Sequence, residues 1–367
     1  MTKQNYKRLG NYIRVIDVRN RELQCSNLLG LSIAKKFIPS IANTIGTDLR
    51  TYKIVHNKQF AYVPVTSRNG DKITIALYEG IDDCIVSQAY TVFEIVDPGQ
   101  LLPDYLMMWF LRPEFDRYAR FKSIGSAREV FDWGEMCEVY LPIPDIKVQR
   151  NIVSEYRAIA NRIKINESLI FKIEEAAQSI YRRTFIDDID KENLPSGWRL
   201  GTIGDIASIS AGGDKPDVFS NSKKEGYSIP IYSNGIEKDG LYGYTNQARV
   251  TEESVTVSAR GTIGFVCYRN NPYVPIVRLL VFLPKSKIGM TSLYLYCLLK
   301  NTRFEGDGAV QLQLTAPKAK EVGVIIPPSN IIHEFTDRIR PLIKYKQSLK
   351  KENDCLKSLS LTLLSLS

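Results

Sequence analysis

The chain has 367 residues, of which 44% are hydrophobic and 24% charged, an ordinary composition for about two globular domains. Its 49 lysines and arginines outnumber its 40 aspartates and glutamates, and the formal net charge of +9 favours a polyanionic partner such as nucleic acid. Six scattered cysteines without a C-x-x-C pair, and only two histidines, argue against a metal site and predict reduced thiols in the cytoplasm. The longest apolar run, interrupted by Arg278, is far shorter than the roughly 18 residues of a membrane span, so no membrane partner is predicted.

The first part of the chain, residues 1–145, is predicted to be a module of short strands followed by a helix. Runs rich in Val, Ile, Tyr and Thr are broken by Gly, Asn and Pro, which is typical of strands and turns. A helix is predicted over 104–111, with Asp104 as its N-cap and Pro113 as the residue that ends it. An apolar strand and the proline-rich turn 142–144 close the module.

The hydrophobic period then changes, and a long helix is predicted over 146–190. Apolar residues recur in alternating steps of four and three from Ile152 to Ile180, without a slip. A strict seam of this kind is typical of a helix that packs against another long helix.

Residues 191–329 repeat the anatomy of the first module, including a helix predicted over 292–300 with Ser292 as its N-cap. No single match between the two copies is persuasive, but five matches occur in the same order, with an offset that shrinks steadily. This order indicates a tandem duplication. The matches pair 9–10 with 203–204, 65–68 with 257–260, 75–78 with 265–268, 109–112 with 297–300, and 141–144 with 325–328.

A second long helix is predicted over 330–367, with a weaker seam from Phe335 to Leu363. Pro341 lies inside the pattern, and it either kinks this helix or marks its true start. The simplest partner for each long helix is the other one, in an antiparallel coiled-coil spacer.

In the antiparallel register, Asn166 and Asn353 lie in one layer, where a buried pair costs stability but specifies the alignment. Lys346 lies opposite Ile173, and its ammonium is expected to reach solvent beyond its packed stem. Two apolar layers flank the asparagines, formed by Ile163 with Leu356 and by Ile170 with Leu349.

No motif for a cofactor, a metal or a catalytic centre emerges from the sequence. A Gly-rich dinucleotide loop, a phosphate loop, a Gly-x-Ser-x-Gly elbow and a His-Glu-x-x-His pair are all missing. We therefore expect no cofactor, no metal and no enzymatic activity.

Short motifs along the chain then point to a family. Residues 194–198 (Leu-Pro-Ser-Gly-Trp), 258–264 (Ser-Ala-Arg-Gly-Thr-Ile-Gly), and the turn 141–144 followed by Gln149-Arg150 resemble motifs of the specificity subunits of type I restriction-modification systems. The second copy departs from the pattern, with His333-Glu334 where Gln-Arg would stand.

The resemblance implies an α+β fold with two mixed α/β target-recognition domains in tandem. Each is followed by a long helix, and the two helices pair as an antiparallel coiled coil. It implies that each domain reads one half of a bipartite target in double-stranded DNA. It also implies assembly with two modification subunits that methylate adenine and with restriction subunits that translocate and cut DNA.

Basic and amide side chains on loops are the expected DNA contacts, since phosphates attract Lys and Arg and base edges pair with Arg, Asn, Gln and Ser. Arg68 and Arg260 occupy equivalent positions, and each is either a phosphate contact or a structural arginine bonded to its own loop. The candidates in the first module are Lys35, Lys36, Arg50, Arg68, Ser126 and Arg128. Those in the second are Lys215, Ser233, Asn234, Arg260, Gln311 and Gln313.

Two other functions stay open. The chain could be an autonomous methyltransferase or nuclease, which would require binding of S-adenosylmethionine or a metal by the protein alone. It could also be a scaffold whose coiled coil assembles other proteins, which would leave DNA binding insensitive to salt or missing.

Overall fold

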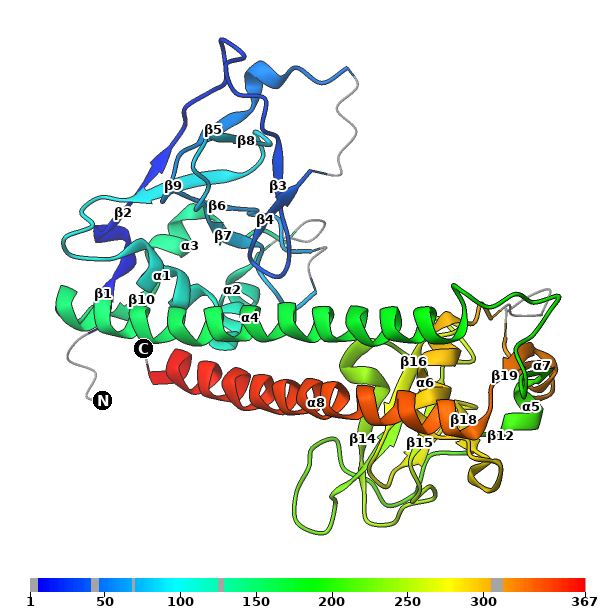
Figure 1. Cartoon of the computed structure of the whole chain (residues 1–367). Coiled ribbons are helices and arrows are strands. Elements are labelled where there is room, and N and C mark those ends of the chain that lie inside the picture. Colours follow the sequence, from blue (N-terminus) through cyan, green and yellow to red (C-terminus); the bar gives the residue numbers. More distant parts are fainter. Residues whose placement is uncertain (1–5, 41–45, 68–69, 125–128, 305–312, 367) are drawn as a thin grey trace. The chain divides into compact units, whose positions relative to one another are not determined.

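The computed structural model (Figure 1) describes residues 6–40, 46–67, 70–124, 129–304 and 313–366. By their internal contacts the residues form two compact units, one made of residues 1–165 with 352–367 and the other of residues 166–351. Each unit holds one globular module together with a part of both long helices.

A four-stranded antiparallel sheet in the order β2-β9-β6-β7 forms the centre of the first module. The rings of Phe60 and Phe93 stack on it with their centroids 4.8 Å apart. Phe110 of helix α1 meets both rings edge to face, so the helix and the sheet share one aromatic core. The elements are β2 (Ile13–Ile16), β6 (Phe60–Tyr62), β7 (Ile75–Leu77), β9 (Thr91–Ile95) and α1 (Pro103–Phe110).

Three two-stranded antiparallel pairs and two further α-helices complete the first module. The pair β1-β10 joins the two ends of the module. Along the chain, β3, β4 and β5 lie between β2 and β6, and β8 lies between β7 and β9. The elements are β1 (Tyr6–Arg8), β3 (Leu29–Leu31), β4 (Phe37–Pro39), β5 (Lys53–Val55), β8 (Cys84–Val86), α2 (Pro113–Lys122), α3 (Trp133–Cys137) and β10 (Tyr140–Pro142).

The second module is built on a sheet in the order β12-β18-β15-β16, also antiparallel throughout. Helix α6 is buried along its apolar length and lies in one core with this sheet. The elements are β11 (Arg199–Thr202), α5 (Ile203–Ile206), β12 (Ala207–Ala211), β15 (Ser254–Val257), β16 (Val266–Arg269), β18 (Leu280–Pro284), α6 (Ser292–Asn301), α7 (Ala316–Glu321) and β19 (Gly323–Ile326).

The shared topology confirms the predicted duplication. The order β2-β9-β6-β7 in the first module matches β12-β18-β15-β16 in the second, and β1-β10 matches β11-β19. The modules differ in their added strands, because the second carries a three-stranded sheet in the order β14-β13-β17. These strands are β13 (Ile229–Tyr232), β14 (Leu241–Thr245) and β17 (Val274–Pro275).

The predicted ends of the two short helices need correction. Pro103 is the first residue of α1, and the N-cap is Leu102 rather than Asp104. Pro113 starts α2 instead of ending α1, because a proline has no N–H to lose at a first helical position. In the second module the side chain of Thr291, not Ser292, caps α6 by accepting a hydrogen bond from the Tyr294 N–H.

The long helices are α4 (Ile146–Phe185) and α8 (Ser329–Leu366), and within each unit they lie side by side in opposite directions (Figure 1). In the first unit Arg162 pairs with Glu352, and Val153 shares a core with Leu364. In the second unit Lys346 pairs with Glu174. Since residue numbers rise on one helix as they fall on the other, the pairing is antiparallel, as predicted.

The residues predicted to form the seam between the long helices are buried or half-buried. Leu349 is buried, as are Asn166 and Asn353, while Ile163, Ile170 and Leu356 are half-buried. Helix α8 begins at Ser329, so Pro341 lies inside it and does not mark its start.

Lys346 departs from the expectation. Its side chain is buried, and its ammonium pairs with Glu174 instead of reaching solvent. Glu174 directly follows Ile173, the residue predicted to lie opposite Lys346. Burial of the ammonium group is tolerable because this carboxylate neutralises its charge.

Candidate nucleic-acid interface

Five loop segments of the second module meet at one place, which we call the loop cluster. Backbone hydrogen bonds join them: the Leu314 N–H donates to the Ala259 carbonyl over 3.0 Å, and the Val277 N–H donates to the Gly213 carbonyl over 2.9 Å. Its segments are 212–215, 233–235, 258–261, 276–278 and 313–314. Five residues predicted to contact DNA lie in it: Lys215, Ser233, Asn234, Arg260 and Gln313.

Asn234 is the centre of the loop cluster. Its Nδ2 donates to the Val277 carbonyl over 2.7 Å, and its Oδ1 accepts from the Ala259 N–H over 2.7 Å. The neighbouring Ser233 N–H donates to the Gly240 carbonyl. The amide group of Asn234 therefore holds two other loops in position, which is a structural role. Its contact with DNA stays a prediction.

Arg260 and Gln313 are brought together although they are far apart in sequence. The arginine Nη2 donates to the Gln313 Oε1 over 2.8 Å. Its Nε is buried and has no acceptor within the part of the chain that the structure describes. The bond of Arg260 therefore goes to another segment of the loop cluster and not to its own loop, and its contact with a phosphate stays a prediction.

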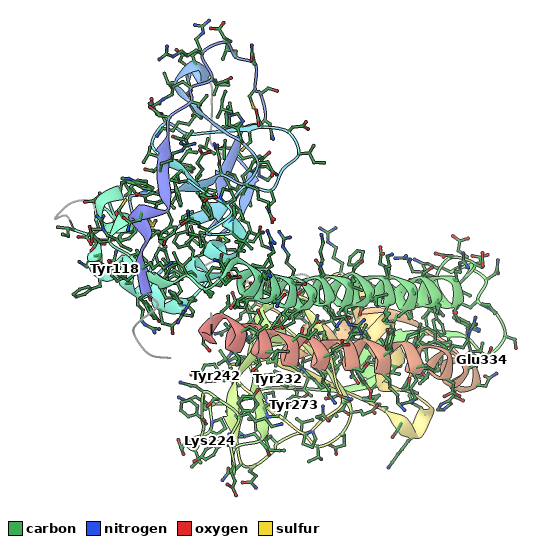
Figure 2. All side chains as sticks on the ribbon, turned by 90° about the vertical axis from the view of Figure 1, so that its left-hand side faces the viewer. Tyr118, Lys224, Tyr232, Tyr242, Tyr273 and Glu334 are labelled. Atoms are coloured by element: carbon green, nitrogen blue, oxygen red, sulfur yellow. The ribbon has the colours of Figure 1, made fainter. Side chains whose placement is uncertain are left out.

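Lys215 is exposed and lies over aromatic rings. Its ammonium is 3.8 Å from the centroid of the Phe219 ring and 5.9 Å from that of Tyr242, which is itself 48% exposed. Figure 2 shows Tyr242 on the same side of the long helices as Tyr232 and Tyr273, with Lys224 farther out. Such contacts keep a lysine at the surface with its charge available to an anion.

Arg278 is a candidate that the sequence motifs did not single out. It lies in the loop cluster and is exposed, next to Val277, which is also exposed. Its signal in the sequence is a charge that interrupts the apolar run between β17 and β18. With Lys215 and Arg260 it gives the five segments three basic residues against one acidic residue, Asp214.

The candidates of the first module lie in different settings. Lys36 and Arg50 are exposed. Lys35 is buried, and its ammonium pairs with Asp116 over 2.7 Å and donates to the Phe110 carbonyl. We therefore assign Lys35 to the interior of its module, since a buried and paired ammonium is not offered to DNA.

Four further candidates, Arg68, Ser126, Arg128 and Gln311, lie outside the described residues.

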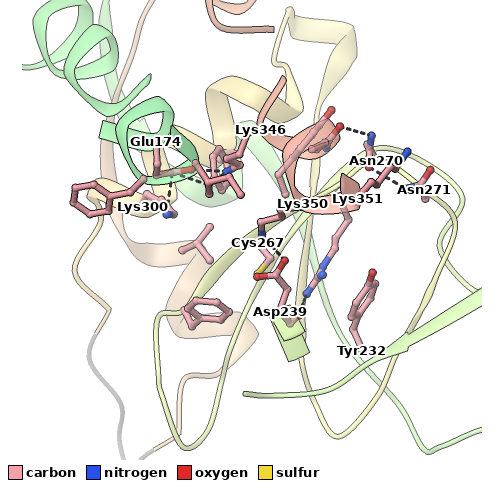
Figure 3. Close-up of a pocket in the computed structure, with 18 of the residues that line it drawn as sticks. Glu174, Tyr232, Asp239, Cys267, Asn270, Asn271, Lys300, Lys346, Lys350 and Lys351 are labelled. Carbon is pink, nitrogen blue, oxygen red and sulfur yellow. Dashed lines mark hydrogen bonds and ion pairs between the residues drawn. The ribbon is translucent and has the colours of Figure 1, made fainter. Parts of the chain in front are cut away.

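A pocket of about 450 Å³ lies in the second unit, between β16, α6 and the two long helices (Figure 3). Several of its charged groups are paired with each other. Glu174 bonds Lys346, Lys300 and the hydroxyl of Tyr296, and Lys350 pairs with Asp239 over 2.6 Å. The pocket therefore resembles an ionic junction more than a reaction centre.

Glu174 stays ionised in this junction. Burial alone would raise the pKa of its carboxyl group, but the ammonium groups of Lys346 and Lys300 and the hydrogen bonds that it accepts lower that pKa to about 2. A carboxylate held in this way is a poor general base at neutral pH.

The described residues bring together no group of three or more His, Cys, Asp or Glu side chains that could hold a metal ion. In the same residues no helix combines the length and the apolar character that crossing a membrane requires.

Comparisons with known proteins place these features in a family. Residues 195–357 match the family model described as the type I restriction modification DNA specificity domain. A putative type I specificity subunit of Mycoplasma pneumoniae is 32% identical over 211 residues, which cover 56% of each chain. A second relative from that organism, the C-terminus of a putative type I specificity subunit, is 36% identical over 108 residues, which cover 29% of this chain and 73% of the relative.

The fold has a counterpart among solved structures. The crystal structure of the type I restriction-modification S subunit from M. genitalium superposes with a TM-score of 0.62, covering 98% of this chain and 94% of that one at 14% identity. The chain spans about half the length of two putative type I specificity subunits of M. pneumoniae, 56% of one and 52% of the other. Taken with the duplicated modules and the antiparallel long helices, these matches establish that the chain belongs to the family of type I restriction-modification specificity subunits.

Proposed function

We propose that this protein is the DNA-reading, non-catalytic subunit of a type I restriction-modification complex. Each module reads one half of a bipartite target in double-stranded DNA. Two modification subunits and the restriction subunits join it and supply the methyl transfer, the translocation and the cleavage. The complex acts on DNA in the cytoplasm, where the six free cysteines of this chain stay reduced.

The loop cluster carries the proposal. Loops that are far apart in sequence bring three basic side chains and several amide and hydroxyl groups to one place in the second module, where hydrogen bonds hold the loops together. A rigid frame that presents polar loops is what base recognition needs, because groups held in position lose little entropy on binding. The net charge of +9 adds attraction to phosphates at long range.

The long helices fit a spacer role. They contain 40 and 38 residues, which corresponds to about 60 Å each at 1.5 Å per residue. Two modules joined by elements of this length are suited to half-sites separated by a gap of unread base pairs.

The enzyme alternative finds little support. The carboxylate in the pocket of the second unit is already paired with two lysines. The scaffold alternative explains the long helices but not the polar loops of the second module.

The test is to co-express the chain with its cognate modification subunits and to map methylated adenines across the genome by single-molecule sequencing. We expect one bipartite motif with a gap of constant length. Exchanging residues 1–145 for the first module of another specificity subunit should change one half of the motif, and exchanging residues 191–329 should change the other half.

A motif that stays the same after both exchanges would contradict the proposal. An assembled complex that gives no methylation and no salt-sensitive DNA binding would favour the scaffold alternative.

A further inference from the structure

The turn between β17 and β18 has an unusual backbone. Val277 and Arg278 follow each other with φ angles of 51° and 59°, in the left-handed region that side chains rarely adopt. This conformation is especially unfavourable for a β-branched residue such as valine. Strain of this kind persists only where the surroundings enforce it, and it is concentrated at functional positions.

The surroundings do enforce it. The Val277 N–H donates to the Gly213 carbonyl and the Arg278 N–H to the Gly212 carbonyl, each over 2.9 Å. The amide of Asn234 holds the Val277 carbonyl at 2.7 Å. A side chain at Gly212 would come within 2.7 Å of the Pro275 carbonyl carbon, so the chain after β12 approaches the end of β17 this closely only with glycine there.

Exposure alternates sharply along the turn. Ile276 and Leu279 on either side are 1% and 2% exposed, whereas Val277 is 47% exposed and Arg278 is exposed as well. Two buried anchors and a network of hydrogen bonds thus present one aliphatic side chain and one guanidinium group at the surface.

The chemistry of the pair suggests what it recognises. A guanidinium group donates two parallel hydrogen bonds to O6 and N7 of guanine in the major groove, and an aliphatic side chain contacts the methyl group of thymine. A phosphate contact needs only charge and tolerates a mobile side chain, so it gives no reason to hold a strained turn in place.

We propose that Arg278 reads a guanine within the half-site of the second module, with Val277 packing against the neighbouring base. This inference rests on the proposed function and adds to it a residue and the base that it selects. Arg278 differs in this from Lys215, whose exposed ammonium is suited to a phosphate.

The experiment uses the complex of the full chain with its modification subunits, and it compares wild type with Arg278→Ala and Arg278→Gln. Methylation is mapped genome-wide, and binding is measured on duplexes that carry each base in turn at every position of both half-sites. Lys287→Ala is the matched control, since Lys287 is an exposed cation beyond the opposite end of β18.

We expect Arg278→Ala to lose roughly 10- to 100-fold of the discrimination at one guanine of the second half-site and none in the first. Arg278→Gln should move the preference at that position toward adenine, because glutamine pairs with adenine N6 and N7. Lys287→Ala should leave the motif unchanged. Equal unfolding temperatures for all variants would exclude misfolding as the cause.

A loss of affinity that is uniform over all sequences, with a salt dependence lowered by about one phosphate contact, would show a phosphate contact and overturn the inference. An unchanged motif in both Arg278 variants would overturn it too, while the proposed function would stand on the wild-type motif. A wild-type complex without any bipartite motif would overturn the proposed function, and this inference with it.

Discussion

The two modules share one frame and differ in what is added to it. In both, an antiparallel sheet of four strands packs on a short helix, and a two-stranded pair closes the module before a long helix begins. The first module adds the antiparallel pairs β3-β4 and β5-β8, whereas the second adds a sheet in which β13 pairs parallel with β17. The two modules thus share the sheet that frames them and differ in the strands added to it.

The two modules also differ in the side chains that connect each one to its long helix. In the first module the buried Gln149 of α4 accepts a hydrogen bond from the N–H of Leu102, which caps α1. In the second, the hydroxyl of Thr336 on α8 bonds that of Thr291, which caps α6, over 2.7 Å. Each long helix is thus tied to the N-cap residue of the helix that packs on the four-stranded sheet of its module, α1 or α6, but through different side chains.

The largest expected effect is a loss of stability when an ion pair of a long helix is broken, and its size should differ between the two units. Glu174→Gln leaves Lys346 buried without an anionic partner and should lower the free energy of unfolding by roughly 3 kcal/mol. The first unit offers a control, since Asp104 pairs with Arg157 and Lys58, which are both substantially exposed, and Asp104→Asn should cost about 1 kcal/mol or less. Thermal unfolding, with hydrogen exchange to locate the change, measures both, and equal losses would contradict the comparison.

Acid should remove the advantage of Glu174. The folded-state pKa of about 2 lies below the ordinary value of 4.5, so its stabilisation is complete above pH 4.5 and is lost as the pH falls toward 2. We expect the difference in unfolding free energy between wild type and Glu174→Gln, roughly 3 kcal/mol at neutral pH, to shrink over that range. Denaturant titrations at several pH values measure it, and a difference independent of pH would be inconsistent with the paired carboxylate.

A third comparison separates two lysines that the sequence does not distinguish. Lys35→Met leaves Asp116 without its cation and should destabilise the first module by about 2 kcal/mol. Lys215→Ala should change stability by less than about 0.5 kcal/mol. In DNA binding by the assembled complex, Lys215→Ala should lower the salt dependence by about one phosphate contact, and Lys35→Met should leave it unchanged. A lower salt dependence for Lys35→Met together with an unchanged one for Lys215→Ala would contradict the roles assigned to the two lysines.

The smallest expected effect concerns the two asparagines predicted to pair between the long helices. Replacing Asn166 and Asn353 together by leucine should raise stability by roughly 1 kcal/mol, since two buried amides become apolar. It should also weaken the alignment of the helices, so that the gap in the methylated motif loses its single length. Unchanged stability together with an unchanged gap would show that the two asparagines do not form one layer.

The sequence by itself determined the duplication, the sheet-and-helix class of both modules, the two long helices and their seam. These features depend on periodic apolar patterns and on turn residues, which act over a few neighbouring positions. The seam from Ile152 to Ile180 could be predicted because burial repeats with the helical period. The caps of α1 and α6 were each misplaced by one or two residues, since neighbouring Ser, Thr, Asp and Pro residues compete for that position.

Only the tertiary structure decided the role of each polar side chain. Lys35 and Lys215 are both lysines in polar loops, yet one is buried against Asp116 and the other lies exposed over Phe219. Arg260 bonds Gln313, although the two are far apart along the chain. Whether a polar group is exposed depends on partners distant in sequence, and no local pattern encodes them, because the cost of burying a charge is set by the residues that the fold brings beside it.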